Sequence, residues 1–210
     1  MNENSLRNKI KYFFYTMSHP MDGFYWIRHK DRGSVLLAII LVALFSFSFT
    51  LNRLHSGFVV NEIDKRGVDS FYELVGILAF YLILCVSNWS ITCLMNGEGR
   101  LKDIAIAIGY GTFPITVGMI VTTLFSHFLA EGEQVFYTLV LGICIAYGIL
   151  LILMGIMQVH NYTLGKTLLT VLLTFIAFLI IVFLLLLLSN LIGAVINFFV
   201  SVYREIIFKA

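Results

Sequence analysis

One uncharged stretch near the C-terminus decides the fold class. Residues 167–188 read TLLTVLLTFIAFLIIVFLLLLL, with no charged residue, glycine or proline among them. A helix of roughly 20 apolar residues crosses a hydrocarbon core about 30 Å thick. A helix that is apolar on every side belongs in lipid or in the core of a large protein, and this chain has only 210 residues. Thr167–Leu188 is therefore predicted to span a membrane.

Four further apolar stretches precede it, and each approaches or exceeds the length needed to cross a bilayer. The connections between them are too short to hold a separate domain. The predicted fold class is therefore all-α: a polytopic membrane protein in which residues 34–188 form one bundle of five transmembrane helices. The other four predicted spans are Ser34–Leu51, Phe71–Met95, Ile104–Leu129 and Val135–Gln158.

The composition supports a lipid environment. Hydrophobic residues make up 60% of the chain and charged residues 12%, against about 45–50% and about 25% in soluble domains. A soluble globule is excluded because it has to cover its surface largely with polar groups, and a disordered chain is excluded by the low charge. The net charge of +2 gives no basic field that would gather nucleic acid. The expected partner is the lipid bilayer, and nucleic acid is not.

Residues 1–33 are predicted to form a cytoplasmic segment at the membrane interface. In Leu6–Met17 the apolar residues recur at helical spacing and the basic residues lie off that stripe, which is typical of a helix on an anionic leaflet. His19-Pro20 should end this helix. The charges that follow suit the cytoplasmic surface, and they also satisfy the positive-inside rule without a specific lipid site. The membrane-surface residues are Trp26, Arg28, Lys30 and Arg32.

The C-terminal part of the chain is predicted to separate from the last span. One helix from Thr167 to Phe208 would be roughly 63 Å long at about 1.5 Å per residue, twice what a bilayer accommodates. We expect the helix to break or leave the membrane at Ser189–Gly193. Residues 189–210 should then form an amphipathic helix that lies flat on the membrane or packs on its own bundle.

The distribution of Lys and Arg predicts the orientation. Nine of the 14 lie on the side of the N-terminus, six of them before the first span, and five lie on the other side. Because basic residues accumulate in cytoplasmic segments, the N-terminus is predicted to be cytoplasmic and the C-terminus extracytoplasmic. The expected location is the plasma membrane, with several passes.

The third span is rich in small residues. Gly109, Gly111 and Gly118 let helix backbones approach closely in lipid, so they are predicted to be helix-packing positions. Pro114 frees the carbonyl group of Tyr110 and should kink the helix there.

The second span carries a polar cluster in which Asn88 and Thr92 share a helix face. An intramembrane Asn usually hydrogen-bonds a neighbouring helix, but it can also contact a substrate. The candidate interhelical or ligand-contact residues are Asn88, Thr92, Tyr110 and Pro114.

No catalytic, cofactor-binding or metal-binding residues are predicted. Cys85, Cys93 and Cys144 lie in apolar runs without a C-x-x-C pair or a nearby histidine, as buried hydrophobes do. No predicted span has Asp, Lys, Arg or His near its middle, where such a residue would mark a proton relay or a charged site. The protein is therefore predicted not to be an enzyme and to need no cofactor.

Four short stretches, in their order against the five spans, resemble those of a known family. They are His19-Pro20-x-Asp22-Gly23-Phe24, Asn96-Gly97-Glu98-Gly99-x-x-Lys102-Asp103, Gly109-Tyr110 followed by Pro114, and Tyr162-Thr163-Leu164-Gly165-Lys166. They are similar to the bacterial branch of the Yip1 family, over roughly residues 17–188. The resemblance implies five spans, a cytoplasmic N-terminus and an extracytoplasmic C-terminus.

The resemblance does not extend to GTPase binding. Eukaryotic members of the family shape or sort membranes in the early secretory pathway and bind small GTPases through a longer N-terminal region. Here 33 residues precede the first span, and Asp22-Gly23-Phe24-Tyr25-Trp26 only loosely follows the D-L-Y-G-P type of motif. GTPase binding is therefore not carried over.

Two functional hypotheses follow. The first is a non-enzymatic protein that organises the membrane or acts as an adaptor or scaffold, with a membrane protein or a second copy of itself as partner. The second is an accessory subunit of a solute transporter, with Asn88, Tyr110 and Pro114 lining a polar path between the second and third helices.

Overall fold

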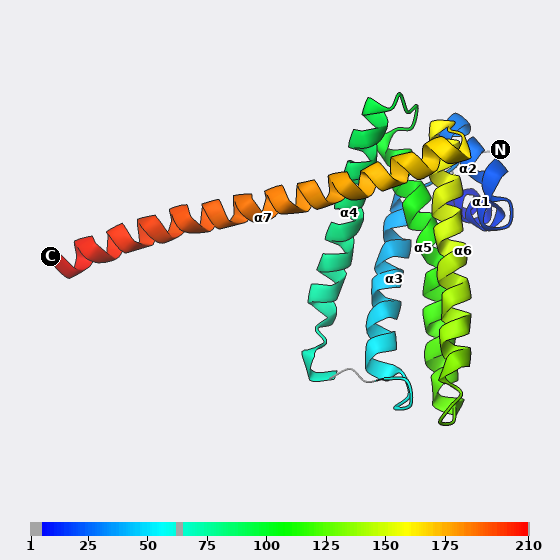
Figure 1. Cartoon of the computed structure of the whole chain (residues 1–210), viewed down its shortest axis with the longest axis horizontal. Coiled ribbons are helices and arrows are strands. Elements are labelled where there is room, and N and C mark those ends of the chain that lie inside the picture. The colour runs from blue at the N-terminus through cyan, green and yellow to red at the C-terminus, as the bar shows by residue number, and fades with distance from the viewer. Residues whose placement is uncertain (1–5, 62–64, 210) are drawn as a thin grey trace.

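The computed structural model describes residues 6–61 and 65–209, and this part of the chain contains helices and no strand. Five of the helices are long and apolar enough to cross a membrane, which confirms the predicted fold class. The described residues form seven α-helices, which are labelled in Figure 1. They are α1 Leu6–Ser18, α2 Pro20–Lys30, α3 Val35–His55, α4 Ser70–Leu94, α5 Leu101–Phe125, α6 Gln134–His160 and α7 Leu164–Lys209, with short 3-10 turns at Lys65–Gly67 and Ser126–Phe128.

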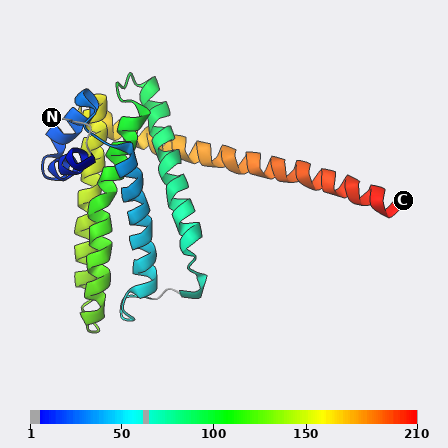
Figure 2. The ribbon, with the colours of Figure 1, turned by 180° about the vertical axis from the view of Figure 1, so that it is seen from behind.

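Helices α3 to α6 run side by side and form the bundle (Figures 1 and 2). Helix α5 is central, because it packs most extensively on both α3 and α6. Polar side chains cap the N-termini of two of these helices. Ser34 Oγ accepts the Leu37 N–H of α3 at 3.4 Å, and Asp69 Oδ1 accepts the Phe71 N–H of α4 at 2.9 Å. These contacts satisfy backbone groups that have no partner within the helix.

Helices α1 and α2 cover one end of this bundle, which is called the N-terminal end below (Figure 1). As expected, the first helix stops before His19-Pro20, and Pro20 begins α2, where its missing N–H costs nothing. The apolar stripe of α1 is divided between two environments. Phe13 is buried against the rings of Tyr110 and Phe113 of α5, whereas Ile10 and Phe14 stay exposed.

Helix α7 corrects the prediction for the C-terminus. It continues unbroken from Leu164 to Lys209, so the expected break at Ser189–Gly193 is wrong, whereas the alternative, that the helix leaves the membrane there, stays a prediction. No proline occurs in α7, and one internal glycine, Gly193, costs only about 1 kcal/mol relative to alanine, which a leucine-rich helix tolerates. Figures 1 and 2 show that α7 passes crosswise over α4 and projects away from the bundle.

Only the beginning of α7 packs on the bundle. Thr167, Thr170 and Thr174 are buried and recur at spacings of three and four residues, so they form one helix face. The contacts of α7 are mainly with α4 and to a smaller extent with α6. From residue 183 onward nearly every described side chain of α7 is exposed.

Candidate functional site at the N-terminal end of the bundle

Three turns at the N-terminal end share a backbone feature. Asp31 ends α2, Asn96 follows α4 and Asn161 ends α6, and each has a positive φ, between 49° and 54°. This left-handed conformation is costly for most residues but is tolerated by Asp and Asn, whose short polar side chains bond locally. The three turns therefore let the chain reverse direction tightly at this end.

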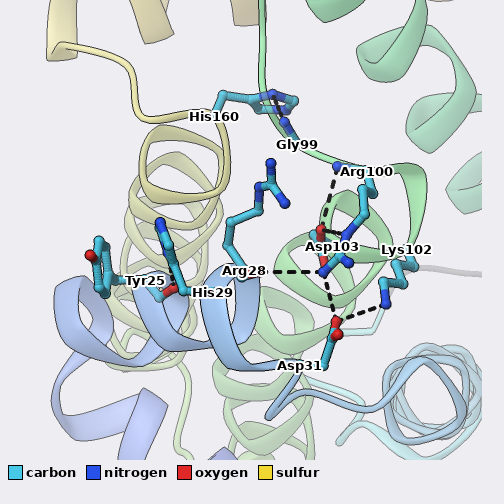
Figure 3. A network of polar contacts seen from close by, with 9 residues as sticks. All are labelled: Tyr25, Arg28, His29, Asp31, Gly99, Arg100, Lys102, Asp103 and His160. Atoms are coloured by element: carbon cyan, nitrogen blue, oxygen red, sulfur yellow. Dashed lines mark hydrogen bonds and ion pairs between the residues drawn. The ribbon is translucent and has the colours of Figure 1, made fainter.

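The turn after α4 is held against the turn after α6. The backbone N–H of Gly99 donates to His160 Nδ1 at 3.1 Å (Figure 3), and the hydroxyl of Tyr162 donates to the Met95 carbonyl at 3.2 Å. Glycine is needed here for space: a Cβ at Gly97 would lie 2.6 Å from the Tyr162 hydroxyl, and a Cβ at Gly99 would lie 2.5 Å from the His160 ring.

An ionic network joins α2 to the start of α5 (Figure 3). Arg100 Nη2 donates to Asp31 Oδ1 at 2.6 Å, and Arg100 Nε donates to Asp103 Oδ2 at 2.7 Å. Lys102 Nζ donates to the same Asp31 oxygen at 2.7 Å. The hydrogen bond from Lys102, together with Arg100, lowers the pKa of Asp31, so this carboxylate is ionised near neutral pH.

The interior of this end contains two N–H donors without an acceptor among the described residues. His160 accepts a hydrogen bond at Nδ1, so in the neutral ring the proton lies on Nε2, which is buried and unpaired. Arg28 Nε is also buried and unpaired, and Figure 3 shows the Arg28 side chain pointing from α2 toward His160. The described part of this site therefore contains more buried N–H donors than acceptors to receive them.

The predicted membrane-surface residues divide into two groups. Lys30 Nζ lies 4.4 Å from the centre of the Trp26 ring, and the Arg32 guanidinium carbon lies 5.8 Å from it. Arg32 follows α2 and also lies over the Tyr12 ring of α1, at 5.5 Å, so cation–π contacts tie both charges to aromatic rings of this end. Arg28 differs, because its side chain turns inward to the site described above.

The structure places Asn88 and Thr92 on the buried side of α4. Asn88 Nδ2 donates to Thr174 Oγ1 of α7 at 3.0 Å, a contact between helices. The Thr92 hydroxyl instead donates to the Trp89 carbonyl of its own helix at 2.9 Å. The sequence identified Asn88 as a polar contact but could not name its partner, which lies 86 residues away.

Tyr110 and Pro114 are not brought to Asn88. Tyr110 is fully buried, and its hydroxyl accepts the Ser34 N–H at 3.2 Å, so it faces α1 and the start of α3. Helix α5 runs through Pro114 without ending. Neither residue is among those that line the cavity with Asn88, and a polar path through the three residues stays a prediction.

The three predicted packing glycines lie at close contacts of α5. A Cβ at Gly109 would lie 2.7 Å from Ala38 Cβ of α3. A Cβ at Gly111 would lie 2.3 Å from the Ile152 side chain, and one at Gly118 would lie 2.5 Å from Cys144 Cβ, both on α6. Each glycine therefore stands where a neighbouring helix leaves no room for a side chain.

Several residues of the site were missed by the sequence analysis. Arg100 entered only the count of basic residues, although its spacing of three from Asp103 at a helix start is a signal of an ion pair. His160 belongs to no local motif, and its contact with Gly99 spans 61 residues. Among the described residues there is no group of three or more His, Cys, Asp or Glu that could hold a metal ion.

The stretches on which the family resemblance rests meet at this end. A Cβ at Gly97 of the second stretch would lie 2.6 Å from the Tyr162 hydroxyl of the fourth, while Phe24 of the first and Tyr110 of the third pack on neighbouring residues, Gly155 of α6 and Phe13 of α1. Comparisons with curated proteins and with solved structures gave no match. The family model described as the Yip1 domain matches residues 14–187, the greater part of the sequence, and the chain therefore belongs to the Yip1 domain family.

Proposed function

We propose that this protein is a non-enzymatic adaptor or organiser of the bacterial plasma membrane. In this proposal the N-terminus is cytoplasmic, the C-terminus is extracytoplasmic, and the protein acts by binding another membrane protein or a second copy of itself. The proposal rests on the exposed apolar side chains of α7, which do not pack on the bundle.

Helix α7 has the properties of an element that recruits a partner in lipid. Its distal half begins with the uncharged apolar run Phe183–Leu188 and carries polar residues from Ser189 onward, and nearly all its described side chains are exposed. A helix segment that is apolar on all sides, as Phe183–Leu188 is, gains nothing from lying in water, and in lipid it is free to pack on other helices through van der Waals contact. The first half of α7 is held to α4 by Asn88 and the threonine face, so the distal half is displayed from a fixed base.

The N-terminal end gives the proposed adaptor a surface at the headgroup level. Trp26 with Lys30 and Arg32 brings an aromatic ring and two cations together at α2 and the turn that follows it. This combination favours an anionic leaflet. The cations agree with a cytoplasmic position for this end.

Photo-crosslinking along α7 tests the proposal. A photoreactive amino acid is placed singly at each position from Leu184 to Leu188 of the full-length protein in cell membranes. We expect protein adducts to be strong at positions one turn apart, such as Leu184 and Leu188, and weak between them, because a packed helix presents one face every 3.6 residues. Gel mass and mass spectrometry then identify the partner.

Two controls complete this experiment. A second copy with a different tag distinguishes self-association from binding to another protein. The same photoreactive residue at Leu36, an exposed position of α3, reports adducts that arise from collisions alone. Adducts on α7 that are absent, or no stronger than at Leu36 and uniform around the turn, would contradict the adaptor proposal.

A further inference from the structure

We propose that the cavity between α4, α5, α6 and α7 binds a neutral long-chain lipid through a free hydroxyl group, which donates a hydrogen bond to Asn88 Oδ1. The site is separate from the distal half of α7, so this inference does not depend on the adaptor proposal.

The orientation of the Asn88 amide is fixed by its neighbours. The Thr174 hydroxyl donates its proton to the Thr170 carbonyl at 2.8 Å. Thr174 Oγ1 can therefore only accept from Asn88, and the atom at 3.0 Å from it must be the donor Nδ2. Asn88 Oδ1 is consequently the other atom of the amide, and it is buried without a partner.

This unpaired oxygen needs a donor from outside the described residues. Asn88 as a whole is only 1% exposed, and a buried polar atom without a hydrogen bond is costly and uncommon in native structures. Because Oδ1 is an acceptor, the missing group is an O–H or N–H. A group that offers only acceptors, such as an ether or ester oxygen, does not fit.

Asn88 lines a cavity of about 210 Å³ whose other walls are almost entirely apolar, including Ile108, Ile152 and Leu153. An engineered apolar cavity of roughly 150 Å³ is large enough to bind benzene. Complete ligand sites are larger, at about 300 Å³ or more, so the cavity accommodates the hydroxyl-bearing end and the first part of a chain. The exposed residues Ile149 and Phe175 lie at its edge, where the rest of the chain passes into the bilayer.

The residues that line the cavity also favour an uncharged ligand. None of the described residues that line the cavity is charged, so a phosphate or an ammonium group bound there would remain uncompensated in an apolar environment. Asn88 lies six residues before the last residue of α4, Leu94, which is about 9 Å along the helix. A neutral hydroxyl at this depth, below the headgroups, is a property of diacylglycerols and of long-chain or isoprenoid alcohols.

Photolabelling with a matched pair of lipids tests the inference without any mutation. The full-length protein is reconstituted in vesicles of phosphatidylcholine and phosphatidylglycerol. One probe is a long-chain alcohol with a diazirine in its chain, and the other is its methyl ether, which has the same chain but no donor. We expect the alcohol to label peptides that contain Ile149, Ile152 and Leu153 about tenfold more than the ether, since one hydrogen bond to a buried acceptor is gained. Equal labelling by the two probes would overturn the inference.

A pair of substitutions distinguishes a ligand site from a contact that only joins two helices. Asn88→Leu removes the acceptor and should abolish the preference for the alcohol. Thr174→Val removes the partner of Nδ2 but leaves Oδ1 in place, so the preference should persist. Loss of the preference in both variants alike would mean that Asn88 only pairs α4 with α7. If Asn88→Leu does not fold, the comparison of probes on the unchanged protein decides.

Competition identifies the source of the hydroxyl. Unlabelled diacylglycerol and an unlabelled isoprenoid alcohol are each added to the vesicles before illumination. Displacement of the alcohol probe by one of them assigns the ligand class. Failure of both to compete would count against a lipid hydroxyl in this cavity.

Discussion

Replacing Gly109 by valine is expected to lower the free energy of unfolding by about 2 kcal/mol, within the range of roughly 1–3 kcal/mol that overpacking costs. Even a single Cβ at this position would lie 2.7 Å from Ala38 Cβ and 3.0 Å from Ala38 Cα. Because Ala38 offers backbone atoms and no flexible side chain, the clash can be relieved only by moving α3 away from α5. SDS-induced unfolding in mixed micelles measures the change.

The matched control is Gly142→Val in α6, where nothing lies within 4 Å of the added Cβ. Both substitutions put the same β-branched residue into an apolar helix, so they share the cost of helix propensity. A Gly142→Val protein that unfolds as easily as Gly109→Val would show that propensity, and not the contact of α3 with α5, accounts for the loss.

The second large effect is expected for Asp103→Ala, which should lower the free energy of unfolding by about 2 kcal/mol, as loss of hydrogen bonds to a charged group does. The Asp103 carboxylate is 1% exposed and accepts from both Nε and Nη2 of Arg100. Its removal releases the guanidinium that ties α5 to α2. The same unfolding assay measures the change.

Asp31→Asn is the comparison that isolates the effect of burial, because asparagine removes the charge but tolerates the left-handed backbone of this position. Asp31 pairs with the same guanidinium, but its side chain is 60% exposed, and an exposed ion pair contributes only about 0–1 kcal/mol. Although both carboxylates pair with Arg100, the substitution at Asp103 is therefore expected to lower the free energy of unfolding more than the substitution at Asp31. Equal losses in the two variants would contradict the assignment of Asp103 as the buried anchor of the network.

The spans were predictable because they depend on local composition. Any stretch as long and apolar as Thr167–Leu188 requires lipid, whatever its neighbours are. The small residues of α5 were recognisable for the same reason, since close helix contact in lipid needs them. The residues that these small residues contact were not predictable. Ala38 meets Gly109 because of the way α3 and α5 pack on each other, which no local sequence pattern indicates.

The error at Ser189–Gly193 has a different origin. The prediction assumed that α7 crosses the bilayer in the same direction as the other spans, and then its length requires a break. The helix itself contains no residue that forces one, and it extends crosswise instead. The ionic network was missed for a further reason: Asp31 and Arg100 are 69 residues apart and meet only because α2 folds back over the bundle.

The docking of α1 and α2 also determines when this protein can finish folding. The Tyr147 hydroxyl of α6 bonds the Met17 carbonyl across 130 residues at 2.6 Å, and the Phe24 ring lies against Gly155. The ribosome makes the two N-terminal helices first, yet their binding surface, which α5 and α6 share, is complete only after α6 has been synthesised. Such distant contacts form late, since the chain between them has to be ordered beforehand. During synthesis the first helices of the protein therefore wait, on the membrane surface, until the four helices from α3 to α6 have been made.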